Sequence, residues 1–326
     1  RAGLLEIAVD AACVRGRFLA WGSDPARGAR VLGAVVSEVD RRLGEVSGAG
    51  TRLDLAVALR RLDRPAEAAE VAETGLLMLD EGVADGLRGA LGLHASAASG
   101  DLGEHERALA LAAGAASDLE RVGLWEDVAE SRRLAALAAE ATDDPSGAAV
   151  HWEAMAHAAE QAARPDLRMV ALRSRPLALI AAGDGSAAGV AIEHAARELQ
   201  ASGLPDEHLR WEDAQLDVQR ARIALLEGRP ADAVAPAGRA LGAFTDLGDT
   251  ANERTAAYLA ARAYESMGDL GSCLAVLKEG ADRAVAGDDP EGARLLGAEL
   301  AQALDRAGRP DEADAVWATY SGETGA

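Results

Sequence analysis

Side chains that could do acid–base or metal chemistry are scattered along this chain and form no recognisable site. His151 and His157 are six residues apart, which places them on different sides of a helix. His194 and Glu198 have i, i+4 spacing and could share a ligand, but an ordinary surface pair is much the better explanation. No H-E-x-x-H motif, phosphate-binding glycine loop or nucleophile elbow occurs. We therefore expect no catalysis, no metal and no cofactor.

The remaining reactive residue types also have structural explanations. The acidic pairs Asp143-Asp144 and Asp288-Asp289 are expected at helix starts, where negative charge complements the helix dipole. Cys13 and Cys273 lie far apart in the chain and offer no disulfide framework, so both are predicted to be small core residues.

The charge balance excludes some classes of partner. The net charge is −21, and Lys278 is the single lysine among 33 basic residues. Such an acidic chain is unsuited to binding nucleic acid or anionic lipid directly, and no run of about 18 apolar residues could span a membrane. The bias toward Arg, Ala and Gly indicates a GC-rich bacterial genome. We expect a cytoplasmic protein, and because the sequence opens at Arg1 without Met, a piece of a longer chain or a renumbered one.

A short turn motif recurs along the chain and organises the rest of it. In Gly308-Arg309-Pro310, glycine can adopt the positive φ that closes one helix, and proline suits the first turn of the next. The motif repeats at steps of 40 residues, with one step of 45, which predicts a helical repeat array. The equivalent turns are Ser23-Asp24-Pro25, Asp63-Arg64-Pro65, Gly103-Glu104, Asp143-Asp144-Pro145, Gly183-Asp184-Gly185, Gly228-Arg229-Pro230 and Gly268-Asp269.

Small residues stand at two fixed offsets from every turn. Two helices can cross closely only where both backbones lack bulk, so these offsets predict the crossing point of each helical hairpin. Five residues after each turn starts stand Gly28, Ala68, Ala108, Ala148, Ala188, Ala233, Cys273 and Ala313. Seven residues before it stand Gly16, Ala56, Ser96, Ala136, Pro176, Ala221, Ala261 and Ala301.

The pattern resembles the tetratricopeptide repeat family over the whole chain, most closely in residues Ala261 to Asp269 (ARAYESMGD). This resemblance implies an all-α fold, a right-handed α-solenoid of about eight helix–turn–helix repeats. Two departures are clear. The period is 40 residues rather than the usual 34, and most units lack the large aromatic residues of the consensus. Longer units of this kind resemble the arrays of bacterial signalling and regulatory proteins.

One irregular join divides the predicted array into units one to five, residues 1–200, and units six to eight, residues 201–326. Five extra residues enter near Ser202 to Asp206, either as a longer loop or as an extra turn on the helix that carries Trp211. Pro176 falls inside a predicted helix, where it removes a hydrogen bond. We expect a bend over residues 176–206.

The family resemblance also implies where a ligand would bind. In that family the first helix of each hairpin lines a concave groove, and in this chain its lining positions are rich in arginine. The Lys/Asn/Arg set of chaperone-binding members is absent. Arginine suits an acidic or amphipathic segment, although these arginines could instead pair with Asp and Glu of neighbouring helices. The candidate binding residues are Arg17, Arg61, Arg133, Arg173, Leu177, Val218, Arg222, Leu225, Tyr258 and Arg262.

Our leading functional hypothesis is a non-catalytic scaffold that binds a peptide or helical segment of another protein in this groove. The alternative is a ligand- or peptide-sensing regulatory module of a larger bacterial signalling or transcription-regulating protein. A third, weaker hypothesis is an array that supports an enzyme domain. No polar helix follows Tyr320, so Trp317 and Tyr320 are expected to be partly exposed. A second copy could cover this C-terminal end, giving a homo-oligomer.

Overall fold

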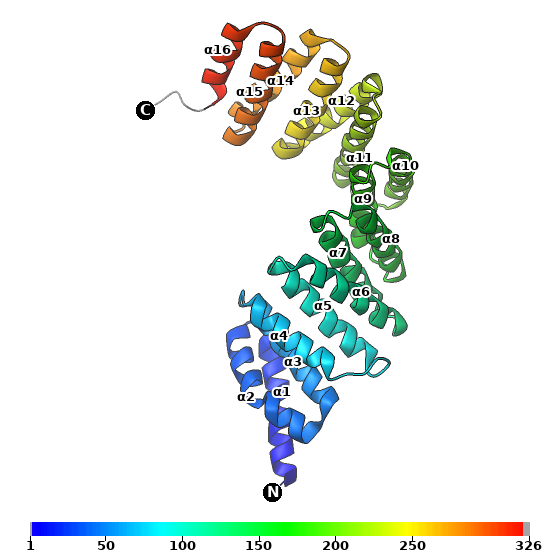
Figure 1. Ribbon diagram of the computed structural model, residues 1–326, viewed down its shortest axis with the longest axis vertical. Helices are drawn as coiled ribbons and strands as arrows, with labels where there is room; N and C mark the ends of the chain where they lie inside the picture. The colour runs from blue at the N-terminus through cyan, green and yellow to red at the C-terminus, as the bar shows by residue number, and fades with distance from the viewer. Residues whose placement is uncertain (1, 322–326) are drawn as a thin grey trace. The chain divides into compact units, whose positions relative to one another are not determined.

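The computed structural model describes residues 2–321, which form sixteen helices and no strand (Figure 1). The all-α fold and its helical hairpins are therefore confirmed. One compact unit ends at Ala178 and a second begins at Leu179. The first contains α1 (Ala2–Trp21), α2 (Pro25–Leu43), α3 (Glu45–Arg60), α4 (Pro65–Leu77), α5 (Asp85–Asp101), α6 (His105–Arg121), α7 (Trp125–Ala141) and α8 (Pro145–Gln161).

Helix α9 (Pro165–Ala181) carries the boundary between the units, with Pro176 in its interior. The second unit continues with α10 (Gly185–Ala201), α11 (Asp206–Leu226), α12 (Pro230–Leu247), α13 (Thr250–Ser266), α14 (Leu270–Ala286), α15 (Pro290–Arg306) and α16 (Pro310–Tyr320). The division at residues 200/201 and the bend over 176–206 stay predictions.

All eight predicted turns join an odd-numbered helix to the next even-numbered one. Gly308 has a φ of 72°, in the left-handed region that glycine enters without strain. Asp143 occupies the equivalent position with a φ of 58°, which aspartate tolerates better than most residues. The next residue, Asp144, is the N-cap of the following helix, and its carboxylate accepts a hydrogen bond from the Gly147 N–H at 2.8 Å. The turn motif thus ends one helix and starts another.

The sixteen small residues at the two predicted offsets are all buried. In one hairpin the two positions touch, because the Ser96 hydroxyl donates a hydrogen bond to the Ala108 carbonyl at 2.8 Å. In another, a Cβ atom on Gly28 would lie 2.6 Å from the Ala20 backbone nitrogen, so only glycine fits there. The predicted crossing points are therefore real contacts between helices.

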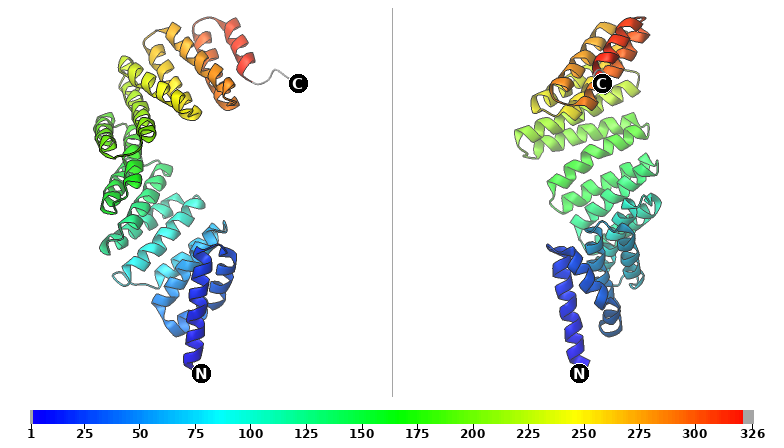
Figure 2. Two further views of the ribbon diagram at one scale, coloured as in Figure 1. Left: turned by 180° about the vertical axis from the view of Figure 1, so that it is seen from behind. Right: turned by 90° about the vertical axis from the view of Figure 1, so that its left-hand side faces the viewer.

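Within each unit, the odd-numbered helices form one layer. Consecutive helices pack antiparallel from α1 to α8 and from α10 to α16, and in addition α1, α3, α5 and α7 pack side by side, as do α11, α13 and α15 (Figures 1 and 2). No even-numbered helix makes a comparable contact with the next even-numbered helix in the described part of the chain. We call the open side of this layer the odd-helix face. It is the surface that the family resemblance assigned to ligand binding.

The irregular join is an extra turn of helix. α11 has 21 residues where α7, α9, α13 and α15 each have 17. Four of the five extra residues therefore lengthen α11 at its N-terminus, and one lengthens the preceding loop. Trp211 follows the added turn, and its indole N–H donates to Asp249 at 2.7 Å.

The C-terminal end differs from the expectation in one respect. Trp317 is 41% exposed, but Tyr320 is only 8% exposed, so the prediction of an exposed Tyr320 was wrong. Its ring packs against Gly297 of α15, and its hydroxyl donates to the Asp282 carboxylate of α14. The glycine makes room for the ring, a relation across two helices that the local sequence does not reveal. A second copy at this end stays a prediction.

Candidate functional site

The first two candidate arginines of the first unit have partners within the fold. Arg17 Nε lies 2.7 Å from the Asp54 carboxylate, which also accepts a hydrogen bond from the Trp21 indole at 2.9 Å. Arg61 donates to the carbonyl oxygen of Ala20 at 2.6 Å and to that of Gly22 at 2.7 Å. Both arginines therefore tie α1 to α3. Asp54 is buried, so its carboxylate holds the Arg17 and Trp21 side chains in place.

A pocket of about 310 Å³ opens on the odd-helix face between α3, α5 and α7. We call it the α3–α5–α7 pocket. Arg60 enters it from α3, Asp101 from α5, and Arg133 and Leu137 from α7, while His105 lies at its edge at the start of α6. Three consecutive repeats thus contribute side chains to one cavity. Of these residues, Arg133 is one of the candidates identified from the sequence.

The pocket carries more positive than negative groups, although the chain as a whole is strongly acidic. Arg60 Nη2 lies 3.5 Å from Asp101 Oδ2, and its buried Nε has no hydrogen-bond partner. Arg133 donates two hydrogen bonds, of 2.8 and 2.6 Å, to Glu130, and these raise the pKa of its guanidinium. A guanidinium with unused donors beside apolar Leu137 is suited to a carboxylate on an apolar stem.

His94 is a neighbouring residue that sequence reasoning missed. Its ring meets the Trp21 ring edge to face, with centroids 6.2 Å apart, and its buried Nδ1 has no hydrogen-bond partner. Burial lowers the pKa of His94 from 6.5 to about 4, helped by the positive charge of Arg60 and opposed by Glu130. The imidazole is therefore neutral near pH 7. Nothing in the spacing of His94 distinguishes it from a surface histidine.

The other candidates of the first unit lie at the end of that unit. Leu177 is 37% exposed on α9, and Arg173 on the same helix is half-buried and has polar interactions of its own. They are not part of the α3–α5–α7 pocket.

The candidates of the second unit fall on α11 and α13. On α11, Val218 is 4% exposed and packs in the core, and Leu225 is partly buried beside it. Arg222 is half-buried, and burial lowers the pKa of its guanidinium. Among the described arginines that are not exposed, Arg222 alone has neither a hydrogen bond nor an ion pair. It remains charged, because an arginine side chain does not lose its proton in proteins.

On α13, the corresponding positions make a closed network. Arg262 donates to Glu265 at 2.6 Å, and Arg306 of α15 contacts the other oxygen of the same carboxylate at 2.7 Å. Tyr258 is 38% exposed beside this network on the same helix. Of these arginines, Arg17 pairs with an acid of a neighbouring helix, whereas Arg133 and Arg262 pair with acids of their own helices.

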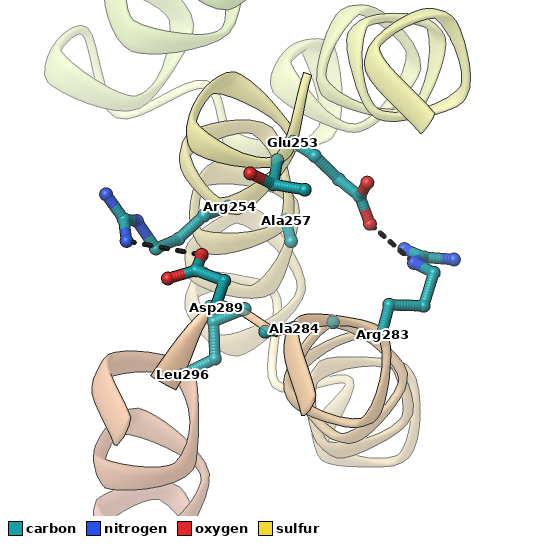
Figure 3. Close-up of a pocket in the computed structure, with 9 residues that line it drawn as sticks. Glu253, Arg254, Ala257, Arg283, Ala284, Asp289 and Leu296 are labelled. Atoms are coloured by element: carbon teal, nitrogen blue, oxygen red, sulfur yellow. Dashed lines mark hydrogen bonds and ion pairs between the residues drawn. The ribbon is translucent and has the colours of Figure 1, made fainter. Parts of the chain in front are cut away.

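A second, smaller cavity lies between α13, α14 and α15 (Figure 3). Ion pairs flank it on both sides: Arg254 with Asp289 at 3.6 Å, and Arg283 with Glu253 at 2.5 Å. Its volume of about 20 Å³ is room for roughly one water molecule. Asp289 also accepts a hydrogen bond from the Gly292 N–H, at the start of α15. This cavity belongs to the packing between helices and is too small for a ligand.

Two other kinds of site are absent from the part of the chain that the structure describes. No group of three or more His, Cys, Asp or Glu side chains is placed to hold a metal ion. No helix there combines the length and the apolar composition needed to cross a bilayer.

Comparison with known proteins identifies the fold and goes no further. No family model and no curated protein matches the sequence. Among solved structures, a signal transduction ATPase with numerous domains from Pyrococcus horikoshii, which has a tetratricopeptide repeat sensor, matches with a TM-score of 0.63 at 12% identity. The match covers 98% of this chain and 47% of that protein.

Two further structures are similar. The apo form of the quorum sensor NprR from B. thuringiensis matches with a TM-score of 0.50 at 11% identity, over 97% of this chain and 98% of that one. The apo form of RapI matches with a TM-score of 0.51 at 10% identity, over 81% and 99%. The tetratricopeptide-like repeat fold expected from the turn motif is thus confirmed.

Proposed function

We propose that this chain is a non-catalytic binding module whose odd-helix face holds an acidic or amphipathic segment of another protein. The observation that carries the proposal is the α3–α5–α7 pocket. It places two arginines and a histidine around an apolar floor in a chain whose net charge is −21. Two arginines brought into one recess between repeats of so acidic a chain are a feature that packing alone does not require.

The chemistry of the pocket selects the class of side chain that would enter it. The Arg60 side chain is 31% exposed and contacts Asp101 only at 3.5 Å, so a carboxylate that reached the accessible part of its guanidinium would gain a charge-assisted hydrogen bond. Leu137, 42% exposed, offers apolar surface next to that position. A Glu or Asp flanked by Leu or Ile on a short helix matches both features.

The test begins with selection of displayed random short peptides on the purified chain. We expect the selected pool to be enriched in Asp or Glu beside aliphatic residues. We also expect its members to bind the Arg60→Gln/Arg133→Gln variant roughly tenfold more weakly or worse. Arg30→Gln is the matched control, because Arg30 is exposed on α2 and has no polar partner among the described residues. Equal binding to the double variant, at an unchanged melting temperature, would overturn the proposal.

A sensing module is the second candidate, and one observation favours it. Nearly the whole of this chain aligns with 47% of a signalling ATPase that has a tetratricopeptide repeat sensor. A sensor must change conformation when its ligand binds. Hydrogen exchange with and without a selected peptide separates the two candidates. Protection confined to α3, α5 and α7 supports a scaffold, whereas changed exchange at turns of distant repeats supports a sensor.

A further inference from the structure

Helix α1 is apolar on two opposite sides. One side packs into the first unit through Val9, Gly16 and Ala20, which are buried. The other side exposes large apolar side chains: Leu4 is 73% exposed, Ile7 67%, Val14 59% and Phe18 80%. With exposed Ala11, these residues form a stripe that we call the outer α1 stripe, defined as Leu4, Ile7, Ala11, Val14 and Phe18.

No described element covers this stripe. α1 packs against α2 and α3, and Figure 2 shows α1 along the edge of the first unit with no helix on its outer side. Four side chains of this size on one exposed helix face are more than a soluble surface usually carries, and such a face normally marks an interaction site.

The spacing of the stripe indicates the shape of its partner. Successive members are 3, 4, 3 and 4 residues apart, the a and d pattern of two heptads. A repeat of 3.5 residues keeps a seam in line only with another helix that lies almost parallel to it along its length. The partner is therefore a helix with its own heptad stripe rather than a loop or a flat surface.

The charges beside the stripe are complementary to those of a second copy of α1. Asp10 lies on one flank, at position g, and Arg15 lies on the other, at position e. Both are exposed, and neither has a hydrogen bond or ion pair within residues 2–321. In a parallel pair of helices, a residue at g meets the residue five places later at e of the partner. Two copies of α1 would thus form two identical Asp10–Arg15 pairs, related by a twofold axis.

We propose that two copies of this chain associate through the outer α1 stripe, with their α1 helices parallel. This association is independent of the odd-helix face, because the stripe lies on the opposite side of α1 from its buried residues. The alternative occupant is a helix of a different protein. In that case Asp10 and Arg15 would not need to have opposite charges, because they would not face each other.

The first test is the molar mass of the full 326-residue chain by light scattering at micromolar concentration. We expect a dimer, and we expect Phe18→Asp and Ile7→Asp to give monomers with unchanged helix content. Leu77→Asp is the matched control, because Leu77 is 88% exposed on α4 of the same unit and lies outside the stripe. A monomeric parent chain would overturn the proposal.

A charge exchange tests the identity of the partner. Asp10→Arg and Arg15→Asp should each raise the dissociation constant of the dimer roughly tenfold, because each places like charges opposite one another. The double variant should restore it. A double variant as weak as the single ones would overturn the parallel arrangement.

Cross-linking supplies an independent readout of orientation. Ile7→Cys in a Cys13→Ser background should oxidise to a disulfide-linked dimer, because a parallel pair places residue 7 opposite its own copy. Failure to cross-link in a chain that still dimerises would contradict the parallel orientation.

Discussion

Arg222 and Arg262 occupy the same place in neighbouring hairpins, six residues before the turn, and have opposite surroundings. Three residues after Arg262 stands Glu265, which holds both Arg262 and Arg306. Three residues after Arg222 stands Leu225, and no other acid reaches the guanidinium. An acid one helical turn away therefore accounts for the difference between these two arginines.

The two arginines can be compared with His94, which is largely buried and uncharged near pH 7. At this residue we expect the largest effect on the free energy of unfolding. His94 has a pKa of about 4 in the folded chain and 6.5 when unfolded, so the unfolded state takes up the proton first as the pH falls. Stability contributed by the neutral ring should be complete above pH 6.5 and should decline by roughly 3 kcal/mol toward pH 4. Urea unfolding across this range measures it.

His94→Gln should lose that part of the acid dependence, and the exposed His208→Gln should retain it. If both variants follow the parent curve, the ring is not held neutral by burial.

The comparison of α11 with α13 assumes that their hairpins cross at equivalent points, and a larger residue there should break it. Ala233 and Cys273 stand five residues after their turns and are both buried. Ala233→Leu and Cys273→Leu should each lower the free energy of unfolding by about 2 kcal/mol, because the crossing has no room for the added atoms. Exposed Ala235→Leu is the control for thermal unfolding. Unchanged stability in Ala233→Leu would mean that the register is wrong.

Glu265→Leu should make α13 resemble α11 in having an arginine with leucine, and no acid, three residues later. It leaves Arg262 and Arg306 beside each other without a carboxylate, and we expect a loss of about 1 kcal/mol, since both arginines are largely solvated. Glu265→Gln, which preserves the shape, should lose a similar amount. A loss in the leucine variant alone would assign the effect to packing.

Arg222→Gln should have the smallest effect, less than about 0.5 kcal/mol, because no partner is left behind. Arg262→Gln, measured beside it by the same denaturant titration, should cost more. Equal losses in the two variants would remove the distinction on which the comparison rests.

Much of the fold could be predicted because its signals are local. Turns such as Gly308-Arg309-Pro310 and small residues such as Ala108 act within one hairpin. Residues at fixed offsets from a turn therefore meet in the folded hairpin. The contacts on the odd-helix face could be predicted only in part. Whether Arg17 or Arg222 finds an acid depends on residues one repeat away, and the burial of His94 and Tyr320 depends on contacts such as that with Gly297. Those relations have no fixed offset in the sequence.

Several contacts between neighbouring repeats span nearly the length of one repeat along the chain. Trp211 contacts Asp249 across 38 residues, and Tyr320 contacts Asp282 across 38. A segment cut from one turn to the equivalent position of the next, such as residues 104–143, would therefore rejoin Gly103 to Asp144 with every remaining neighbour in its old relation. A chain of this kind can therefore gain or lose whole repeats during evolution. Each gain or loss changes the number of spaces between repeats that could become pockets.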